Sequence, residues 1–179
     1  MTDDASMPPW AEAGERRRAH VARVVALLDA WADAMRLDDA ERLAWRDAGR
    51  WHDALRDAPE PTLRELSGDT TSPVALLHGP ATAERLARDG ESRANVLAAV
   101  RWHTLGCARW DRVGRALYLA DYLEPGRAFA RSERAFIAST VPRDLDGAFR
   151  QVVRLRIETG LRDGRALHPR TVDLWNSLS

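Results

Sequence analysis

Apolar residues recur at three- and four-residue spacing along most of the chain, which is the spacing of one face of an α-helix. The pattern is clearest from about Glu15 onward, where its positions are His20, Val24, Leu27, Leu28, Trp31 and Met35. It predicts a helix that has His20 on its buried face. Because no run with the alternation of a half-buried strand reaches a convincing length, the sequence predicts an all-α protein.

Helix-end signals divide the rest of the chain. The predicted N-cap residues are Asp38, with Glu41 three positions later as in a capping box, then Ser72, Ser92 and Asp111. We expect the helix after Asp38 to run to His52, and Gly79-Pro80 to distort or restart the helix near His78. Further helices are expected at about 62–66, 131–139, 144–160 and 169–178.

The length of 179 residues suits one helical domain. We expect a loose N-terminal leader over residues 1–14 and a single domain over 15–179, with a core of about 15–128 and C-terminal helices at about 131–179. The formal net charge is zero, so neither nucleic acid nor an anionic membrane is expected as a partner. Cys107 is the only cysteine and the first ten residues do not resemble a signal peptide, so we expect a cytoplasmic protein without an intramolecular disulfide.

Four of the five histidines lie inside or at the end of apolar, helix-like stretches, where a polar ring is costly unless it has a partner. These four are His20, His52, His78 and His103, whereas His168 is expected in an exposed turn. Asp53 follows His52 directly, and imidazole nitrogen and carboxylate oxygen both bind divalent metals. One buried histidine is more often a satisfied core residue, but four together with the His-Asp doublet indicate a metal site.

The order His20, His52-Asp53, His78, His103, Asp121 resembles that of the HD superfamily of metal-dependent phosphohydrolases, in particular its two-metal subset. Three motifs resemble the YqeK-like HD hydrolases, the symmetrical bis(5'-nucleosyl)-tetraphosphatases. These motifs are Leu76-Leu77-His78-Gly79-Pro80, Arg101-Trp102-His103-Thr104-x-Gly106 and Tyr118-Leu119-Ala120-Asp121-Tyr122-Leu123-Glu124-Pro125-Gly126-Arg127. The resemblance extends from about Arg17 to the C-terminus, includes His168-Pro169-Arg170-Thr171, and is most specific over the third motif.

The resemblance implies an HD-domain helical bundle with a binuclear metal site, and an enzyme that hydrolyses diadenosine tetraphosphate symmetrically to two ADP. The implied metal ligands are His20, His52, Asp53, His78, His103 and Asp121, with Asp53 as the bridge. Two divalent ions can share a hydroxide that attacks a phosphorus near the middle of the polyphosphate. Because the ligands are rich in nitrogen, iron is the expected metal, with manganese or another first-row metal as the alternative.

Asp53 and Arg56 are the expected catalytic residues, and the expected substrate-binding residues are Arg56, Thr104, Gly106, Glu124 and Arg127. The two arginines would contact phosphate oxygens, Thr104 and Gly106 would shape the phosphate pocket, and Glu124 would orient Arg127 or a ligand histidine. The plain alternatives are solvated charges for Arg56 and Glu124 and a simple helix end for Thr104 and Gly106. Trp102, beside His103, is a further residue that could flank a nucleotide base.

The chain departs from the family pattern at four positions. Arg56 replaces a lysine, Leu105 a second threonine, Thr82 a glycine, and Arg18 an aromatic residue. These changes leave the implied ligands intact, so they bear on rate and substrate preference. Another HD phosphatase or phosphodiesterase and a non-catalytic nucleotide-binding HD module are the alternatives for the function, and a homodimer is left open. A nucleic-acid-binding helical protein is disfavoured because the sequence has no basic stripe.

Overall fold

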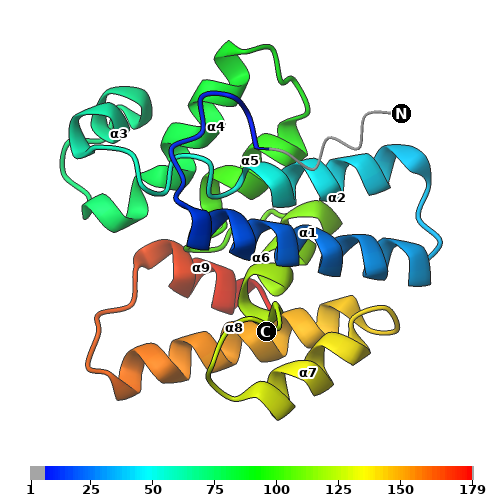
Figure 1. The fold of residues 1–179 in the computed structure, drawn as a ribbon. Coiled ribbons are helices and arrows are strands. Elements are labelled where there is room, and N and C mark those ends of the chain that lie inside the picture. The colour runs from blue at the N-terminus through cyan, green and yellow to red at the C-terminus, as the bar shows by residue number, and fades with distance from the viewer. Residues whose placement is uncertain (1–6, 179) are drawn as a thin grey trace.

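Helices make up the regular structure of residues 7–178, which are the residues that the computed structural model describes (Figure 1). They are α1 (Glu15–Ala34), α2 (Asp39–Trp51), α3 (Glu60–Ser67), the 3-10 turn η1 (Val74–Leu76), α4 (His78–Arg88), α5 (Ala94–Trp102), α6 (Arg112–Leu123), α7 (Arg131–Thr140), α8 (Leu145–Arg162) and α9 (Pro169–Ser177). No strand occurs among these residues, so the all-α prediction is confirmed. Within the same range no helix is long and apolar enough to cross a membrane.

Two of the predicted N-caps are confirmed. Asp38 precedes α2 and accepts a hydrogen bond of 2.8 Å from the backbone N–H of Glu41. Asp111 precedes α6 and accepts from the first free backbone N–H groups of that helix. Such caps satisfy donors that have no partner inside the helix. The local sequence therefore sets where these two helices begin.

The predicted N-cap at Ser72 is wrong. The N-cap of η1 is Pro73, and the side chain of Asp69 accepts from the N–H of Ser72 at 2.9 Å, which holds Ser72 in a turn before the helix. The predicted restart is confirmed, because α4 begins at His78 directly before Gly79. Pro80 consequently lies in the first turn of α4, where a missing N–H costs little.

The predicted N-cap at Ser92 is also wrong. The N-cap of α5 is Arg93, and no side chain caps that helix. The carboxylate of Glu91 instead accepts the N–H of Arg93 at 2.8 Å and pairs with its guanidinium at 2.6 Å. This double contact fixes the chain direction at the start of α5, so Ser92 remains exposed.

Helix α6 is the centre of the fold. It packs against α1, α2, α5, α7 and α8, and Figure 1 shows it between the pair α1 and α2 and the layer formed by α7, α8 and α9. Its buried residues are Val113, Gly114, Ala116, Leu117, Tyr118, Leu119, Ala120 and Leu123. A helix that is apolar on nearly all sides belongs inside a bundle. Its one acidic residue, Asp121, lies in the last turn, where α1 and α6 meet the site described below.

The predicted loose leader lies partly outside the described residues, which begin at residue 7. Within the described part, the N–H of Glu12 donates to the carbonyl of Ala54 at 2.8 Å, and the N–H of Asp57 donates back to Glu12 at 3.0 Å. Met7 is buried against Val21. Residues 7–14 thus contact the loop that follows α2. The division into a leader over 1–14 and a single domain over 15–179 stays a prediction.

The C-terminal helices fasten the loop that follows α5. Arg156 on α8 donates to the carbonyl of Thr104 at 3.0 Å, and Thr171 on α9 donates to the carbonyl of Leu105 at 2.9 Å. Gly106 ends this loop with a φ of +87°, and a Cβ placed there would lie 2.3 Å from Cδ2 of Leu174. Glycine is needed at this position both for the backbone conformation and for the close approach of α9.

We expect Gly106→Ala to destabilise the protein more than Gly164→Ala. Gly164 also has a positive φ, +68°, but a Cβ there would meet nothing within 4 Å. The control should therefore lose about 1–2 kcal/mol from backbone strain alone, and Gly106→Ala should lose about 1–3 kcal/mol more because it overpacks the contact with Leu174. Urea unfolding of both variants measures the difference. If both variants lost the same free energy of unfolding, the close contact between Gly106 and Leu174 would not contribute to stability.

Candidate metal centre

The carboxylate of Asp53 lies between two pairs of histidines. Its Oδ1 is 3.2 Å from Nε2 of His78 and 3.4 Å from Nε2 of His103. Its Oδ2 is 3.6 Å from Nε2 of His52 and 3.9 Å from Nε2 of His20. Asp53 and all four rings are buried. Each carboxylate oxygen therefore faces its own pair of imidazole nitrogens.

Helix ends bring these side chains together. His52 directly follows α2, His103 directly follows α5, and His78 is the first residue of α4. Gly79 lets α4 approach α5 closely, because a Cβ at Gly79 would lie only 2.8 Å from the carbonyl oxygen of Arg101. The absence of a side chain at Gly79 thus permits the contact between His78 and His103, whose Nε2 atoms are 3.0 Å apart.

The outer nitrogen of each ring is held by an oxygen. In His52 and His103, Nδ1 lies 2.7 Å from the carbonyl oxygen three residues earlier, and in His78 the same distance is 3.1 Å. A carbonyl can only accept, so these contacts assign the proton of His52 and His103 to Nδ1 and leave their lone pairs on Nε2. In His78, Nδ1 lies between the carbonyl of Ala75 and the donor Nη1 of Arg56 at 3.2 Å, which accommodates either tautomer. The lone pairs of His52 and His103 consequently face Asp53, which is the arrangement found in histidines that bind metals.

His52 has the clearest unsatisfied atom of the centre. Its Nε2 is buried and has no hydrogen-bond partner among the described residues. Burial lowers the pKa of His52 to about 4, an effect that the nearby charge of Asp53 only partly offsets. The ring is therefore neutral near pH 7. A buried, neutral nitrogen without a partner is expected where a cation binds.

The donor atoms fit a metal ion in type and spacing. Two ligand atoms that are each about 2.1 Å from one ion lie about 3.0–3.4 Å apart for angles from octahedral to tetrahedral. The separations among His78, His103 and Oδ1 of Asp53 fall between 3.0 and 3.4 Å. A second group of donor atoms, from His20, His52 and Asp53, also lies within 4.8 Å. The cluster is therefore compatible with divalent metal binding.

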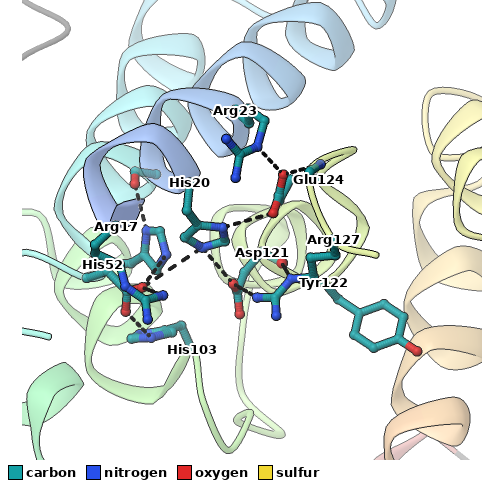
Figure 2. A network of polar contacts seen from close by, with 12 residues as sticks. Arg17, His20, Arg23, His52, His103, Asp121, Tyr122, Glu124 and Arg127 are labelled. Atoms are coloured by element: carbon teal, nitrogen blue, oxygen red, sulfur yellow. Dashed lines mark hydrogen bonds and ion pairs between the residues drawn. The ribbon is translucent and has the colours of Figure 1, made fainter. Parts of the chain in front are cut away.

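Asp121 joins the cluster from the last turn of α6 (Figure 2). Its Oδ1 is 3.1 Å from Nε2 of His20 and accepts from Nη2 of Arg127 at 2.7 Å. Burial raises the pKa of Asp121, but the contacts with His20 and Arg127 outweigh burial, so the pKa lies well below its usual range. The pKa of His20 is raised, because its contacts with Asp121 outweigh the effect of burial. Asp121 is thus an ionised carboxylate beside the outer edge of the histidine cluster.

Glu124 holds the far side of His20. It is buried, and its Oε1 lies 3.2 Å from Nδ1 of His20. Its Oε2 accepts from Nε of Arg23 and from the N–H of Gly126, both at 2.6 Å. Burial raises the pKa of Glu124, but these donors outweigh burial and the pKa is lowered. Glu124 therefore contacts one of the ligand histidines predicted from the sequence, as Figure 2 shows.

Three other predicted site residues lie at the border of the cluster. Oγ1 of Thr104 is 3.3 Å from Nε2 of His103, so this hydroxyl faces the lone pairs. Arg56 donates through Nη1 to the carbonyl of Ala75 at 3.2 Å, beside the outer nitrogen of His78. Gly106 is buried against α9 and shapes the loop after Thr104.

Sequence reasoning missed Arg17. Its Nη1 forms an ion pair of 2.7 Å with Oδ2 of Asp53, on the side that faces His20 and His52. The signal that could have found it is the three-residue spacing from Arg17 to His20, which places both side chains on one face of α1. Every basic residue of the chain is an arginine, so this one carried little information.

A second missed residue, Arg134, fastens the segment that follows Asp121. It is buried on α7. Its guanidinium donates to four backbone carbonyls, those of Tyr122, Glu124, Arg127 and Phe129. Five N–H donors in a fixed plane suit this task. Arg134 therefore determines where the backbone of Arg127 lies, although it is distant from the histidines in sequence.

A cleft of about 870 Å³ opens beside the cluster, and its inner part is lined by Asp121, Thr104 and Arg127. Its outer part lies between the segment that follows α6 and helix α8, with the loop to α9. Trp102, which the sequence suggested could flank a base, has the guanidinium of Arg170 over its ring at 3.6 Å. That face of Trp102 is already covered.

Comparisons with known proteins give consistent similarities, although no family model matches the chain. The chain is 26% identical over 172 residues to the symmetrical bis(5'-nucleosyl)-tetraphosphatase of Halalkalibacterium halodurans. The aligned region covers 92% of this chain and 89% of that protein. It is 25% identical over 139 residues to the protein of the same name from Bacillus subtilis, covering 73% of this chain and 74% of that protein. Over 65 residues, which are 35% of this chain and 34% of the relative, it is 36% identical to the Staphylococcus aureus protein of that name.

A solved structure from Clostridium acetobutylicum, described as a predicted HD superfamily hydrolase involved in NAD metabolism, has a TM-score of 0.77 and 27% identity, covering 92% of this chain and 89% of that one. The architecture is therefore the HD-type helical bundle that the motifs predict. The resemblance to symmetrical bis(5'-nucleosyl)-tetraphosphatases is likewise confirmed by the relatives at 25–26% identity.

We expect Arg134→Met to loosen the segment after Asp121. Methionine fills part of the space but donates nothing, so four backbone carbonyls lose their partner, of which that of Glu124 is buried and the others partly buried. The expected loss is about 3 kcal/mol, which corresponds to a fall in Tm of about 6–12 °C for a chain of this size. Calorimetry and limited proteolysis of the segment over 125–130 measure both effects. The control is Arg131→Met, an exposed position on the same helix; equal effects of the two variants would contradict the role of Arg134.

Proposed function

We propose that this protein is a metal-dependent phosphohydrolase that cleaves diadenosine tetraphosphate symmetrically into two ADP. The observation that carries the proposal is the position of Asp53, whose two oxygens face separate pairs of histidines. Asp121, which contacts His20, lines the cleft beside this cluster. The curated relatives support the choice of substrate, since they carry the name of that activity.

The proposed ligands are His20, His52, Asp53, His78, His103 and Asp121, with Asp53 shared by two ions. When bound, divalent ions would supply Lewis-acid polarisation of phosphoryl oxygens and a nucleophile derived from water. The role of the protein is to keep the Nε2 lone pairs of His52 and His103 free, which it does by giving each Nδ1 a carbonyl partner. Nε2 of His20 faces the carboxylate of Asp121 at 3.1 Å, so a cation bound there would replace the proton between them. Donors made only of imidazole nitrogen and carboxylate oxygen favour iron, with manganese or another first-row metal as the alternative.

The arginines at the border would hold the polyphosphate. Arg127 lines the cleft and lies against Asp121, so a phosphate that reaches Asp121 meets this guanidinium. Arg17 pairs with Asp53, and we propose that it shifts to a phosphate oxygen when a cation takes its place. Nη1 of Arg56 faces the carbonyl of Ala75 and Nδ1 of His78, and the donors on Nη2 and Nε would be directed to the substrate. Thr104 would donate its hydroxyl to a phosphoryl oxygen.

The reaction requires one water and no protein nucleophile. The oxygen of water loses a proton to solvent and forms a bond to one of the two central phosphorus atoms, which becomes the terminal phosphate of the first ADP. The bond from that phosphorus to the central bridging oxygen breaks, and the second ADP leaves with this oxygen. The cationic side chains reduce the repulsion between the polyphosphate and the carboxylates of the centre, and they orient the central phosphates for attack.

Protein purified anaerobically and loaded with iron or manganese should convert diadenosine tetraphosphate to ADP alone. Asp53→Asn should lower kcat at least about 1,000-fold, because the two metal positions share this carboxylate. Chromatography of the products measures both. Asp89→Asn, an exposed carboxylate at the end of α4, is the matched control and should keep full activity.

The same assay distinguishes the alternatives. Hydrolysis of a mononucleotide or a cyclic nucleotide, with diadenosine tetraphosphate left intact, would contradict the substrate and keep the hydrolase. Metal binding without hydrolysis of any nucleotide would point to a non-catalytic nucleotide-binding HD module.

The number of metal ions bound per chain should fall stepwise when one ligand, and then the shared ligand, is replaced. We expect two ions per chain in the unchanged protein, about one in His103→Ala, and close to none in Asp53→Asn, because only Asp53 belongs to both donor groups. Elemental analysis after desalting measures the ratio. His168→Ala is the control, since His168 is exposed and caps α9. A single ion per chain in every variant that retains metal would contradict a binuclear site.

A further inference from the structure

The cleft beyond Arg127 contains an aromatic wall that the hydrolytic centre does not use. Tyr122 follows Asp121 directly, and its ring packs edge-on against Phe129 with centroids 5.7 Å apart. Figure 2 shows the side chain of Tyr122 directed away from His20 and toward the ribbon of α8. Both aromatic residues line the cleft together with Asp121. The wall thus begins one residue from the cluster and extends outward.

Phe129 is exposed for reasons that the fold makes clear. It is 47% exposed although a phenylalanine would gain by burial. The next residue, Ala130, has a φ of +43°, a left-handed conformation that is unfavourable for alanine. Arg134 holds the segment by its carbonyls and lies 4.8 Å from the Phe129 ring and 5.9 Å from the Tyr122 ring. Arg134 therefore covers one face of Phe129, and the exposed part of the ring is available at the cleft. Backbone strain such as that at Ala130 is often found at binding sites.

The wall on α8 carries two cationic side chains among apolar and acidic ones, Leu155, Ile157 and Glu158. Arg156 lines the cleft, donates to the carbonyl of Thr104 and lies 4.4 Å above the ring of Tyr118, so it is held in place. Arg162, one helical turn and a half further along α8, is exposed and lines the cleft as well. Charged side chains therefore line the cleft at Asp121 and Arg127 and along α8, whereas its aromatic side chains are those of Tyr122 and Phe129, on the side formed by α6 and the segment that follows it.

We infer that the outer part of this cleft is a nucleoside subsite, in which Phe129 and Tyr122 form the stacking surface for the base of one ADP moiety. The inference rests on the proposed function for the orientation of the ligand. Polyphosphate belongs at the inner end, next to Arg127 and the cluster, and the base belongs at the outer end, where an aromatic face is open. Arg156 contacts the ribose or the phosphate nearest to it. The ligand class is a nucleoside diphosphate, alone or as one half of a dinucleoside polyphosphate.

Stacking on an aromatic face depends little on the identity of the base. The subsite therefore binds ADP and GDP with similar affinity. Loss of one base–aromatic stack typically weakens binding by about 5- to 150-fold, and we expect about tenfold for Phe129→Ala. Inorganic tripolyphosphate carries the charge without a base, so its binding should not change in this variant.

The test is equilibrium binding of ADP, GDP and tripolyphosphate to the metal-loaded full chain, measured by calorimetry. Phe129→Ala should bind ADP and GDP about tenfold more weakly and tripolyphosphate as before. Phe136→Ala is the matched control, since Phe136 is 66% exposed on α7. Phe129→Trp should restore ADP binding, and Phe129→Leu should not, because leucine offers no π-face.

The outcomes separate this inference from the proposed function. Unchanged ADP binding in Phe129→Ala overturns the subsite. An equal loss for ADP and tripolyphosphate also overturns it, because the residue then acts only through the fold. If the unchanged protein does not hydrolyse diadenosine tetraphosphate but ADP binding still depends on an aromatic ring at position 129, the proposed function fails and the subsite holds.

Discussion

The buried carboxylate of Asp53 constrains the rest of the structure. An ionised carboxylate that is only 3% exposed is very costly unless positive or donor groups surround it. Burial raises the pKa of Asp53, but the positive charge that His52 gains in acid, together with the contacts with His103 and His78, outweighs burial, so the pKa lies well below its usual range. Near pH 7 the His52 ring is neutral, and the positive partner of Asp53 is Arg17, which forms a direct ion pair with it. The group therefore remains charged, and the fold has to bring its partners to it from separate helices.

Two of the histidines around Asp53, His52 and His103, lie at helix ends, where backbone carbonyls are available as hydrogen-bond partners. The last turns of a helix leave backbone carbonyls without partners. His52 and His103 each use such a carbonyl, three residues earlier, as the acceptor for Nδ1. One contact thus satisfies the end of the helix and orients the ring. This explains how polar rings can be fully enclosed while α6 beside them is lined almost entirely by apolar residues.

The sequence predicts the helices well because the signals for them are local. Apolar spacing and the caps at Asp38 and Asp111 depend on residues within a turn of each other. The two predicted caps that are wrong, Ser72 and Ser92, failed because a carboxylate earlier in the chain fixes the turn before the helix: Asp69 accepts from the N–H of Ser72 and Glu91 accepts from the N–H of Arg93, so each helix begins after the predicted cap. The His-Asp order also places the cluster, since each of its members is attached to a helix end or a buried helix face.

Arg17 and Arg134 could not be predicted in the same way. Arg17 pairs with a carboxylate 36 positions away, and Arg134 contacts carbonyls that no periodic pattern reveals. Their roles depend on how helices pack, and neither residue type is distinctive in a chain whose basic residues are all arginine. The aromatic face of Phe129 is similar in this respect: the sequence gives no reason for its exposure, which follows from the contacts of Arg134 and the backbone at Ala130.

The four departures from the family pattern lie around the cluster and outside it. Leu105 lines the cleft beside Thr104, so it replaces a hydroxyl with apolar surface where a substrate would pass. Thr82 is buried in α4 and its hydroxyl has no partner among the described residues, which makes it a cost to stability near His78. Arg56 still presents a cation, but it is fastened to Ala75. Arg18 donates to the carbonyl of Ala13 in the segment before α1. Leu105 and Arg18 can therefore vary the shape of the cleft and of the segment before α1 without changing the buried cluster. Arg56 is different, because its backbone N–H donates to the carbonyl of Asp53 at 3.1 Å and its guanidinium lies 3.2 Å from Nδ1 of His78, so the residue at this position also affects the charge around the cluster.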